Sequence, residues 1–330
     1  MTHMLSLLPK SRFEESGVEI PGGLAFLADY RPDAIAEASA GIEGLFMPPS
    51  HPRLDADLLA RLGSVRIIQT AGAGFDSVDH AAAAKIGLIV CNSPAQNAIT
   101  VAVSGAVICL QRELAYADEA IKSGAYAQAR ERILGRGACE LFGATVGIVG
   151  LGGIGRALAP RLAAFGATVV ASDVFWPEAF AQEHGIRRVD LDELFAVSDI
   201  VTLHCPLMDA TRGLVGVERL ASMKPGAILV NAARGGIVDE TALADALERG
   251  IIRGAAIDNF ESEIPSPGNP LLRLSPEARR RVLFSPHLAG VTRAAFARLI
   301  RQAIGNLENS LRGLPPQFSV NGLSSIRPSA

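Results

Sequence analysis

A glycine-rich segment in the middle of the chain has the residue types and spacing that bind phosphate groups. Gly150, Gly152 and Gly155 occur as G-x-G-x-x-G, between the apolar run 145–149 and a helical run at 156–165. The first glycine permits a tight turn, the second lets the backbone approach a pyrophosphate, and the third allows a helix to pack closely on a strand. Free amides at the start of the helix would hold the phosphate charge. This context favours a dinucleotide site over the alternative, a glycine-rich packing turn.

An acidic residue at the end of the next apolar run bears on the choice of dinucleotide. Asp173 follows the run 168–172 and lies beyond Gly155 at the distance expected for a ribose-binding carboxylate. Such a carboxylate accepts hydrogen bonds from ribose hydroxyls and repels a 2′-phosphate. The next three residues, VFW, supply no cation that would bind that phosphate. We therefore expect NAD (NADH) as the cofactor, with NADP disfavoured.

Three further polar residues each follow a strand-like run. Arg234 lies in NAARGG, Glu263 in DNFESE and His287 in SPHLAG. The carboxyl ends of parallel strands share one edge of a sheet, and ligands bind at that edge. A guanidinium can orient a carbonyl, an imidazole can move a proton near neutral pH, and a carboxylate can keep that imidazole charged. With a nicotinamide cofactor, these residues predict hydride transfer at a carbonyl group, although each alone would more often be an ordinary surface or ion-pair residue.

The elements that would position these residues alternate between β-rich runs and Ala/Leu-rich amphipathic runs, which is typical of parallel sheets covered by helices. In the first hundred residues we expect strands at 24–27, 44–47, 65–69 and 88–91 and helices at 55–62 and 80–85. A second set of strands is expected at 145–149, 168–172, 200–204, 227–231, 254–258 and 282–285, which fits a dinucleotide-binding fold. The largely uncharged run 95–113 predicts a buried connecting helix, followed by a polar segment to about Cys139. The run 294–313 predicts a last helix that ends at Gly313 and carries the chain back.

The composition excludes several classes of protein. The 330 residues are 49% hydrophobic and 20% charged, which indicates a globular chain of about two domains. Dispersed basic residues and a net charge of −3 argue against a nucleic-acid partner. The four cysteines have neither disulfide-framework nor metal-ligand spacing, so we expect no metal and a reducing compartment. The sequence has no signal-peptide pattern and no apolar run of about 18 residues, so we expect a cytoplasmic protein without a membrane partner.

Taken in order, the motifs resemble those of the D-isomer-specific 2-hydroxyacid dehydrogenase family over nearly the whole chain. They are AGAGFDSVD (71–79), NSPAQNAITVA (92–102), the Gly150 loop with Asp173, LHCPLMDATRGLV (203–215), NAARGGIVDETAL (231–243), AIDNFESE (256–263), NPL (269–271) and SPHLAGVT (285–292). The resemblance implies an α/β fold in which a Rossmann NAD-binding domain, residues 101–289, is inserted into a smaller flavodoxin-like substrate domain, residues 1–100 and 290–330. Both domains would be doubly wound parallel sheets. It also implies a homodimer that uses the polar arm from about Tyr116 to Cys139.

The resemblance also implies a role for each catalytic candidate. Arg234 would bind the substrate carboxylate and polarise its carbonyl, His287 would act as the acid/base, and Glu263 would pair with His287. The family spacing from Asp258 selects Glu263 and leaves Glu261 as a structural acid.

Supporting roles follow from the same resemblance. Backbone amides of Ala73 and Gly74 would receive the substrate carboxylate, although an ordinary strand-to-helix turn is the alternative for these two residues. Asp258 would accept a hydrogen bond from the nicotinamide carboxamide. Cys205 has no base beside it in the sequence, so we do not expect a nucleophile there. The residues expected to line the cofactor are Thr100, Gly150, Gly152, Gly153, Ile154, Gly155, Asp173, His204, Cys205, Pro206, Thr211, Ala232, Ala233, Arg234, Asp258, His287 and Gly290.

The sequence thus predicts an NAD-dependent oxidoreductase that interconverts a 2-oxo acid and its D-2-hydroxy acid, with domain closure excluding water. Val103, Asn259 and Ile264 depart from the family pattern, which leaves the substrate side chain open. Two alternatives remain at this point. An NAD(H)-sensing, corepressor-like interaction protein would keep the fold and bind NADH with negligible turnover. An amino-acid dehydrogenase of the wider fold class would oxidise NADH only when ammonia is present.

Overall fold

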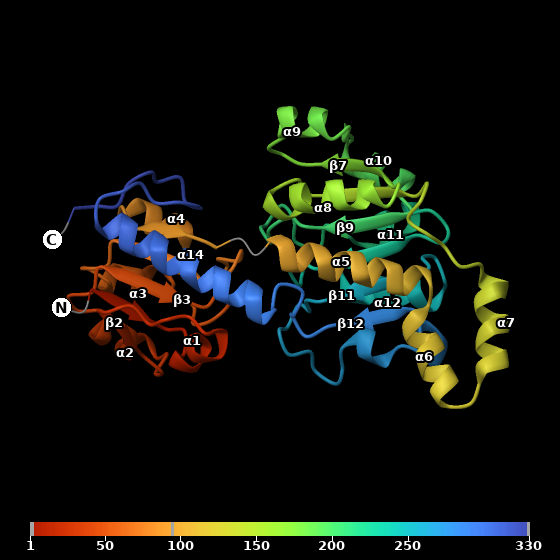
Figure 1. The fold of residues 1–330 in the computed structure, drawn as a ribbon, viewed down its shortest axis with the longest axis horizontal. Helices are drawn as coiled ribbons and strands as arrows, with labels where there is room; N and C mark the ends of the chain where they lie inside the picture. Colours follow the sequence, from red (N-terminus) through yellow and green to blue (C-terminus); the bar gives the residue numbers. More distant parts are fainter. Residues whose placement is uncertain (1–2, 94–95, 329–330) are drawn as a thin grey trace. The chain divides into compact units, whose positions relative to one another are not determined.

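The computed structural model describes residues 3–93 and 96–328. The chain forms two compact units (Figure 1). Unit 1 comprises residues 1–95 and 292–330, and unit 2 comprises residues 96–291. Each unit has its own sheet and its own apolar core. The sequence predicts domain boundaries near residues 100 and 290, with substrate bound by one domain and NAD by the other. This division of binding between the two units stays a prediction.

Unit 1 contains a five-stranded sheet in the order β2-β1-β3-β4-β5, with every neighbouring pair parallel. This is the order of a flavodoxin-like doubly wound sheet. Its elements are β1 (Met4–Ser6), α1 (Lys10–Ser16), β2 (Leu24–Phe26), α2 (Pro32–Ala38), β3 (Gly44–Met47), α3 (Ala56–Arg61), β4 (Ile67–Thr70), α4 (His80–Lys85), β5 (Ile89–Cys91) and α14 (Arg293–Leu311).

The core of unit 1 joins the two ends of the chain. Strands β3 and β4 are buried at every residue, as expected for parallel strands that are covered on both faces. Helix α14 packs its apolar side chains, including Ile300 and Leu307, into the same cluster as Phe13 of α1 and Phe46 of β3. The predicted last helix is confirmed, and it stops just before Gly313, whose φ of +91° ends the helical turn.

Unit 2 contains a seven-stranded parallel sheet in the order β12-β11-β10-β9-β6-β7-β8. When β6 is numbered as strand 1 and the sheet is read from β8 to β12, the order is 3-2-1-4-5-6-7. This is the Rossmann order with one strand added. Its elements are α5 (Gln96–Gln111), α6 (Leu114–Lys122), α7 (Tyr126–Arg136), β6 (Thr145–Val149), α8 (Gly153–Ala164), β7 (Thr168–Ser172), α9 (Glu178–Glu183), β8 (Arg187–Arg188), α10 (Leu191–Val197), β9 (Ile200–Leu203), α11 (Val217–Ser222), β10 (Ile228–Asn231), α12 (Glu240–Glu248), β11 (Gly254–Ile257), the 3₁₀ helix η1 (Pro270–Arg273), α13 (Pro276–Arg279) and β12 (Val282–Phe284).

Two apolar clusters in unit 2 cover the two faces of this sheet. Helices α5 and α8 contribute to one cluster, and α10, α11 and α12 contribute to the other. The strand order reverses between β6 and β9, which are paired neighbours. In open α/β sheets ligands bind at the carboxyl ends of the strands beside such a reversal. The segments that follow β6 and β9 are therefore placed where a ligand-binding loop belongs.

The predicted α/β class and doubly wound sheets are confirmed, while several short elements differ from the prediction. Strands β1 and β8 were not predicted, because three and two residues are too few to show a period. The polar segment before Cys139 forms two helices, α6 and α7, each with one small buried residue. The connecting helix runs over Gln96–Gln111, and residue 95 of its predicted span lies outside the described residues.

One finding concerns helices that could cross a membrane. Among residues 3–93 and 96–328, no single helix has the length and apolar character that this requires. One pair, Ile99–Gln111 and Leu114–Lys122, meets the length and composition criteria together but is bent by 62°.

Candidate active site

The glycine loop after β6 has the steric features that a bound pyrophosphate requires. Gly150 has φ +97°, and a Cβ there would lie 2.8 Å from the backbone nitrogen of Cys205. A Cβ on Gly155 would overlap the carbonyl of Gly150, so helix α8 can pack this closely only with glycine there. Gly152 is different, because the space around its missing Cβ is open. Gly153 and Ile154 begin helix α8 beside that space, with the amides of a helix N-terminus.

Asp173 is tied to this loop from the end of β7. Its Oδ2 accepts a hydrogen bond from the backbone nitrogen of Leu151 at 2.6 Å, and its Oδ1 accepts one from Phe175 at 2.7 Å. Two backbone donors therefore fix the orientation of the carboxylate beside the glycine loop. The residues of the loop and Asp173 fit an NAD cofactor by this test of shape and charge.

The segment after β9 places a neutral histidine at the carboxyl edge of the unit 2 sheet, the edge at which the glycine loop lies. The Nε2 atom of His204 lies 2.9 Å from Oγ1 of Thr202. Burial lowers the pKa of His204 to about 4, so the imidazole is neutral at pH 7. Its Nδ1 is buried without a hydrogen bond among the described residues. This residue was predicted to line the cofactor, and its neutral state makes it unsuitable as a proton donor at neutral pH.

The next residues form a hydrogen-bonded turn around Thr211. Its Oγ1 donates to the carbonyl of Pro206 at 2.6 Å and accepts from the nitrogen of Met208 at 2.8 Å.

Burial raises the pKa of the Cys205 thiol to about 11. A protonated thiol is a poor nucleophile, in agreement with the expectation that Cys205 is not one.

Arg234 lies in a turn after β10 that a buried asparagine organises. Asn231 Nδ2 donates to the carbonyl of Arg234 at 2.9 Å, and Asn231 Oδ1 accepts from the nitrogen of Ala233 at 3.2 Å. The guanidinium of Arg234 also donates to the carbonyl of Ala233 at 2.7 Å. Ala232 belongs to the same turn. The sequence reasoning did not single out Asn231, although its place at the end of a strand is typical of a residue that caps a turn.

Glu263 and His287 are brought together. The Nδ1 atom of His287 lies 2.8 Å from Oε1 of Glu263. His287 has φ +55°, which is uncommon for a residue other than glycine and is often associated with a functional site. Glu261, the competing acid, contributes its backbone nitrogen to a different contact.

Asp258 holds the backbone around His287. Its carboxylate is buried and accepts from the nitrogens of Leu288 at 2.9 Å and Ala289 at 3.1 Å, and from the hydroxyl of Ser285. Its carbonyl accepts from the nitrogen of His287 at 2.9 Å. Asp258 was predicted to contact the nicotinamide, and the partners seen here are those of a residue that fixes a loop. Gly290 follows this loop directly.

Glu240, at the start of α12, holds the loop of Glu263 in place. Its Oε1 accepts from the nitrogen of Glu261 at 2.7 Å, and its Oε2 accepts from Nδ2 of Asn269 at 2.6 Å. A Cβ on Gly235 would overlap the carbonyl of Phe260, so the turn of Arg234 and the loop of Glu263 are in direct contact. The sequence reasoning missed Glu240, because nothing local distinguishes it from other acids in the first turn of a helix.

The remaining predicted residues lie in both units. In unit 2, Thr100 is buried on α5, and its hydroxyl donates to the carbonyl of Asn97 at 2.9 Å. In unit 1, Ala73 and Gly74 lie in the turn after β4. The Gly74 carbonyl accepts from Thr70 Oγ1 at 2.8 Å, and the Ala73 carbonyl accepts from Asn92 Nδ2 at 2.8 Å. Within the described part of the chain, no group of three or more His, Cys, Asp and Glu residues could hold a metal ion.

Comparisons with solved structures find the same two-sheet architecture. The PH0520 protein of Pyrococcus horikoshii superposes with a TM-score of 0.84 at 28% identity, covering 97% of this chain and 95% of that one. D-lactate dehydrogenase of Aquifex aeolicus, solved with NAD and lactic acid, superposes with a TM-score of 0.82 at 25% identity, covering 97% and 99%.

Sequence comparisons point to the same group of enzymes. D-3-phosphoglycerate dehydrogenase of Archaeoglobus fulgidus is 39% identical over 282 residues, which is 85% of this chain and 51% of that protein. Glyoxylate reductase of Korarchaeum cryptofilum is 34% identical over 278 residues, which is 83% of this chain and 82% of that enzyme. This chain therefore spans about half the length of the phosphoglycerate dehydrogenase. The family model for the NAD-binding domain of D-isomer specific 2-hydroxyacid dehydrogenases matches residues 104–289, which is more than half of the 330 residues. The chain belongs to the D-isomer specific 2-hydroxyacid dehydrogenase family, and its cofactor is NAD.

Proposed function

We propose that this protein interconverts a 2-oxo acid and its D-2-hydroxy acid, using NAD(H) as the redox partner. The observation that carries the proposal is the contact between Nδ1 of His287 and Oε1 of Glu263 at 2.8 Å. This pair follows strands of the same sheet whose glycine loop fits a dinucleotide. The names of the relatives support the substrate class, because lactate, glyoxylate and phosphoglycerate are all 2-hydroxy or 2-oxo acids.

The contact with Glu263 assigns the two nitrogens of His287 to different tasks. A carboxylate accepts hydrogen bonds, so Nδ1 carries a proton and Glu263 stabilises the charged imidazolium. Nε2 is then the atom that exchanges a proton with the substrate. In reduction, Nε2–H protonates the 2-oxo oxygen and leaves a neutral ring that still donates from Nδ1. In oxidation, neutral Nε2 takes the proton of the 2-hydroxyl group.

Arg234 provides the fixed positive charge. Its planar guanidinium can bind a carboxylate through two parallel hydrogen bonds and polarise the adjacent carbonyl. The backbone amides of Ala73 and Gly74, in the turn after β4, are proposed to bind the same carboxylate group of the substrate. When bound, NADH supplies the hydride that the carbonyl carbon accepts.

An assay of NADH oxidation with a panel of 2-oxo acids tests this proposal. Glyoxylate, hydroxypyruvate, pyruvate and bulkier 2-oxo acids would be compared with NADH and NADPH, each with and without ammonia. We expect saturable, ammonia-independent NADH oxidation with at least one of these acids. Arg234→Gln should raise KM and lower kcat, whereas the exposed and unrelated Arg249→Gln should leave both unchanged.

Three outcomes, the second of which also needs measurements of NADH binding and of self-association, would contradict the proposal. Oxidation that requires ammonia would identify an amino-acid dehydrogenase. NADH binding without turnover of any acid, together with NADH-dependent self-association, would identify a corepressor-like interaction protein. Wild-type activity in Arg234→Gln would show that the guanidinium does not have the proposed role.

A homodimer through the arm of residues 116–139 also belongs to this proposal. Helices α6 and α7 leave several large apolar side chains exposed, among them Ile121, Tyr126 and Leu134. Such side chains on a pair of adjacent helices are typical of a surface that a partner covers. Light scattering at micromolar concentration should give the mass of two chains, and a monomeric mass would contradict this part of the proposal.

A further inference from the structure

Three successive carbonyl groups in the turn after β4 of unit 1 are all hydrogen-bonded. Each accepts from one donor at 2.8 Å: residue 72 from the backbone nitrogen of Ser93, residue 73 from Nδ2 of Asn92, and residue 74 from Oγ1 of Thr70. Thr70 is the last residue of β4, and Asn92 and Ser93 follow β5 directly. Because β4 and β5 are neighbours in the sheet, all three carbonyls point towards the ends of two adjacent strands.

The direction of these carbonyls fixes the direction of three amides. None of the peptide bonds from Gly72 to Phe75 is cis. In a planar trans peptide, the C=O group of one residue and the N–H group of the next residue point in opposite directions. The N–H groups of Ala73, Gly74 and Phe75 therefore point away from the residues that bind the carbonyls.

These three amides are donors without a partner in the described part of the chain. Among residues 3–93 and 96–328, the nitrogens of Ala73, Gly74 and Phe75 have no hydrogen-bond acceptor. Gly74 is buried, and its two neighbours are half-buried. A buried amide that lacks an acceptor costs free energy. Three adjacent N–H groups of this kind are suited to an anion, whose oxygens would satisfy them.

A network of buried side chains holds the donors of the turn in place. Nε2 of Gln69 donates to Oγ of Ser93 at 2.9 Å, and Oε1 of Gln69 accepts from Nδ2 of Asn306 at 2.7 Å. None of these three residues is more than 6% exposed. The nitrogen of Asn92 donates to the carbonyl of Phe318 at 3.1 Å. Helix α14 and the segment after it thus fix the residues that bind the turn, as a satisfied buried network does.

We propose that Asn92 and Thr70 are positioning residues for the substrate carboxylate. This inference rests on the proposed function, in which amides of the turn after β4 bind that group. Asn92 aims the N–H group of Gly74, and Thr70 aims that of Phe75, because each holds the preceding carbonyl. Phe75 thereby adds a third amide to the two that the sequence predicts. Donors that are aimed in advance bind an anion more tightly, because they need no reorganisation.

Nuclear magnetic resonance of the full, isotope-labelled chain tests where the carboxylate binds. NADH is kept saturating, and oxamate, an unreactive analogue of a 2-oxo acid, is added in steps. The amide resonances of Ala73, Gly74 and Phe75 should shift saturably with a single Kd, because each N–H group gains a charged acceptor. Oxamate binding that leaves these resonances in place would overturn the inference, and so would the absence of saturable binding.

Two variants remove the positioning contacts, and each has a matched control. Asn92→Ala removes one donor of the turn, whereas Asn321→Ala removes an asparagine that binds the backbone around β5. Thr70→Val keeps the shape of a buried side chain without its hydroxyl, whereas Ser77→Ala removes a hydroxyl that donates to Pro49. The Kd for oxamate should rise about tenfold or more in Asn92→Ala and Thr70→Val, and less than about twofold in both controls. The Kd for NADH should stay within about twofold in all four.

Thr70→Val also serves as the second variant if Asn92→Ala does not fold. Steady-state kinetics then separate a positioning role from a structural one. With the best 2-oxo acid from the panel, each variant should raise KM about tenfold and lower kcat less than about threefold, because the amides bind the carboxylate and not the reacting carbonyl. A lower kcat with unchanged KM would contradict the inference.

The same measurements distinguish failure of this inference from failure of the proposed function. If the wild type oxidises NADH with 2-oxo acids while Asn92→Ala and Thr70→Val bind oxamate as the wild type does, only the positioning role is wrong. Losses of the same size in Asn321→Ala and Ser77→Ala would lead to the same conclusion. If the wild type turns over no 2-oxo acid, the proposed function is wrong, and the oxamate titration still shows whether the three amides bind a carboxylate.

Discussion

His287 presents its Nδ1 atom 2.8 Å from Oε1 of Glu263 while its own backbone has a left-handed φ of +55°. A residue other than glycine adopts this conformation at a cost, so surrounding contacts must hold it. Asp258 supplies them, because its carbonyl and carboxylate bind the backbone from His287 to Ala289. The proposed proton donor is therefore positioned by Glu263, which contacts its ring, and by Asp258, which holds the backbone of its loop.

The first prediction concerns this backbone clamp. Asp258→Ala removes the buried acceptor of two backbone nitrogens and one hydroxyl, so we expect kcat to fall about 100-fold and the free energy of unfolding to fall by about 3 kcal/mol. Asp258→Asn keeps one acceptor oxygen, so its losses in kcat and in the free energy of unfolding should be smaller. Steady-state kinetics and urea unfolding measure these effects, with the exposed Asp245→Ala as control. Unchanged kcat in Asp258→Ala would show that the clamp does not position His287.

The second prediction concerns Glu240 as a positioning residue. Glu240→Ala frees the loop of Glu263 from α12, so kcat should fall about tenfold while the Kd for NADH stays within about twofold. Glu240→Gln keeps one carbonyl acceptor and should recover part of the loss. If Glu240 acts only through Glu263, adding Glu240→Ala to Glu263→Gln should cost little more than Glu263→Gln alone. Additive losses in kcat would contradict this role.

The third prediction separates two glycines of the dinucleotide loop. Gly152 has open space around it and a negative φ, so Gly152→Ala should fold normally, but its methyl group would lie where a pyrophosphate approaches. We expect the Kd for NADH to rise about tenfold with an unchanged Tm. Gly155→Ala overlaps the carbonyl of Gly150 and should lower the Tm as well. Fluorescence titration and thermal unfolding measure both, and equal Tm losses would contradict the distinction.

The fourth prediction concerns cofactor choice. Asp173→Ser removes the charge that would repel a 2′-phosphate, so kcat/KM for NADPH should rise about tenfold relative to that for NADH. Part of the change will be a lower kcat/KM for NADH, because the carboxylate also accepts from the Leu151 nitrogen. Asp192→Ser on the exposed start of α10 is the control. An unchanged NADPH to NADH ratio would show that Asp173 does not set the preference.

The fifth prediction concerns pH. Because the pKa of His204 is about 4 in the folded chain and 6.5 ordinarily, the unfolded chain binds a proton between these values that the folded chain does not. His204 therefore stabilises the fold above pH 6.5, and this contribution is lost as the pH falls towards 4. Between pH 7 and pH 5 the loss should be about 2 kcal/mol. Urea unfolding of the wild type and His204→Asn at both pH values tests this, and equal losses in the two proteins would contradict it.

The glycine loop, Asp173 and the strand ends that carry Arg234, Glu263 and His287 could be predicted because each signal is local. A strand, a turn and a helix in succession are visible within about twenty residues, and parallel order then brings the strand ends to one edge. The pairing of Glu263 with His287 came from the family resemblance, and the geometry is compatible with it.

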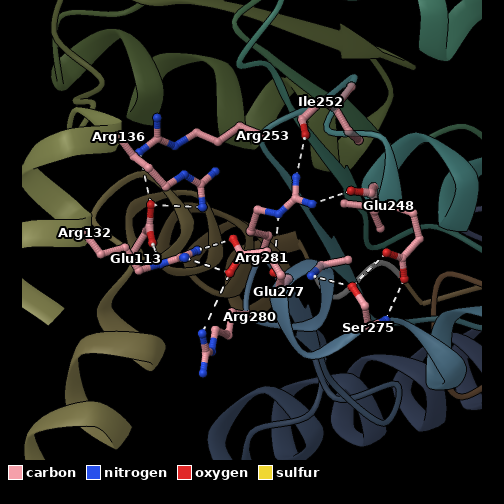
Figure 2. Close-up of polar contacts among 12 residues, drawn as sticks. Glu113, Arg132, Arg136, Glu248, Ile252, Arg253, Ser275, Glu277, Arg280 and Arg281 are labelled. Carbon is pink, nitrogen blue, oxygen red and sulfur yellow. Dashed lines mark hydrogen bonds and ion pairs between the residues drawn. The ribbon is translucent and has the colours of Figure 1, made fainter. Parts of the chain in front are cut away.

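The supporting residues could not be predicted in the same way. Glu240 and Asn269 meet across 29 positions of sequence, and Asp258 reaches Leu288 across 30. Such contacts depend on the finished packing of loops, and each residue alone looks like an ordinary polar side chain. The ion pairs that Glu113 and Glu277 make with arginines (Figure 2) were missed for the same reason, because their partners come from distant segments. Those partners are Arg132, Arg136, Arg253 and Arg280. The substrate role of Ala73 and Gly74, the homodimer and the cytoplasmic location stay predictions.

Single-turnover kinetics test the central claim most directly. Wild type and His287→Gln would be saturated with NADH and mixed in a stopped-flow instrument with the best 2-oxo acid from the panel, and the decay of reduced nicotinamide absorbance would be recorded. If Nε2 of His287 delivers the proton, the rate should fall about 100-fold to 10,000-fold in the variant. A variant rate within about threefold of the wild type would show that another group protonates the substrate.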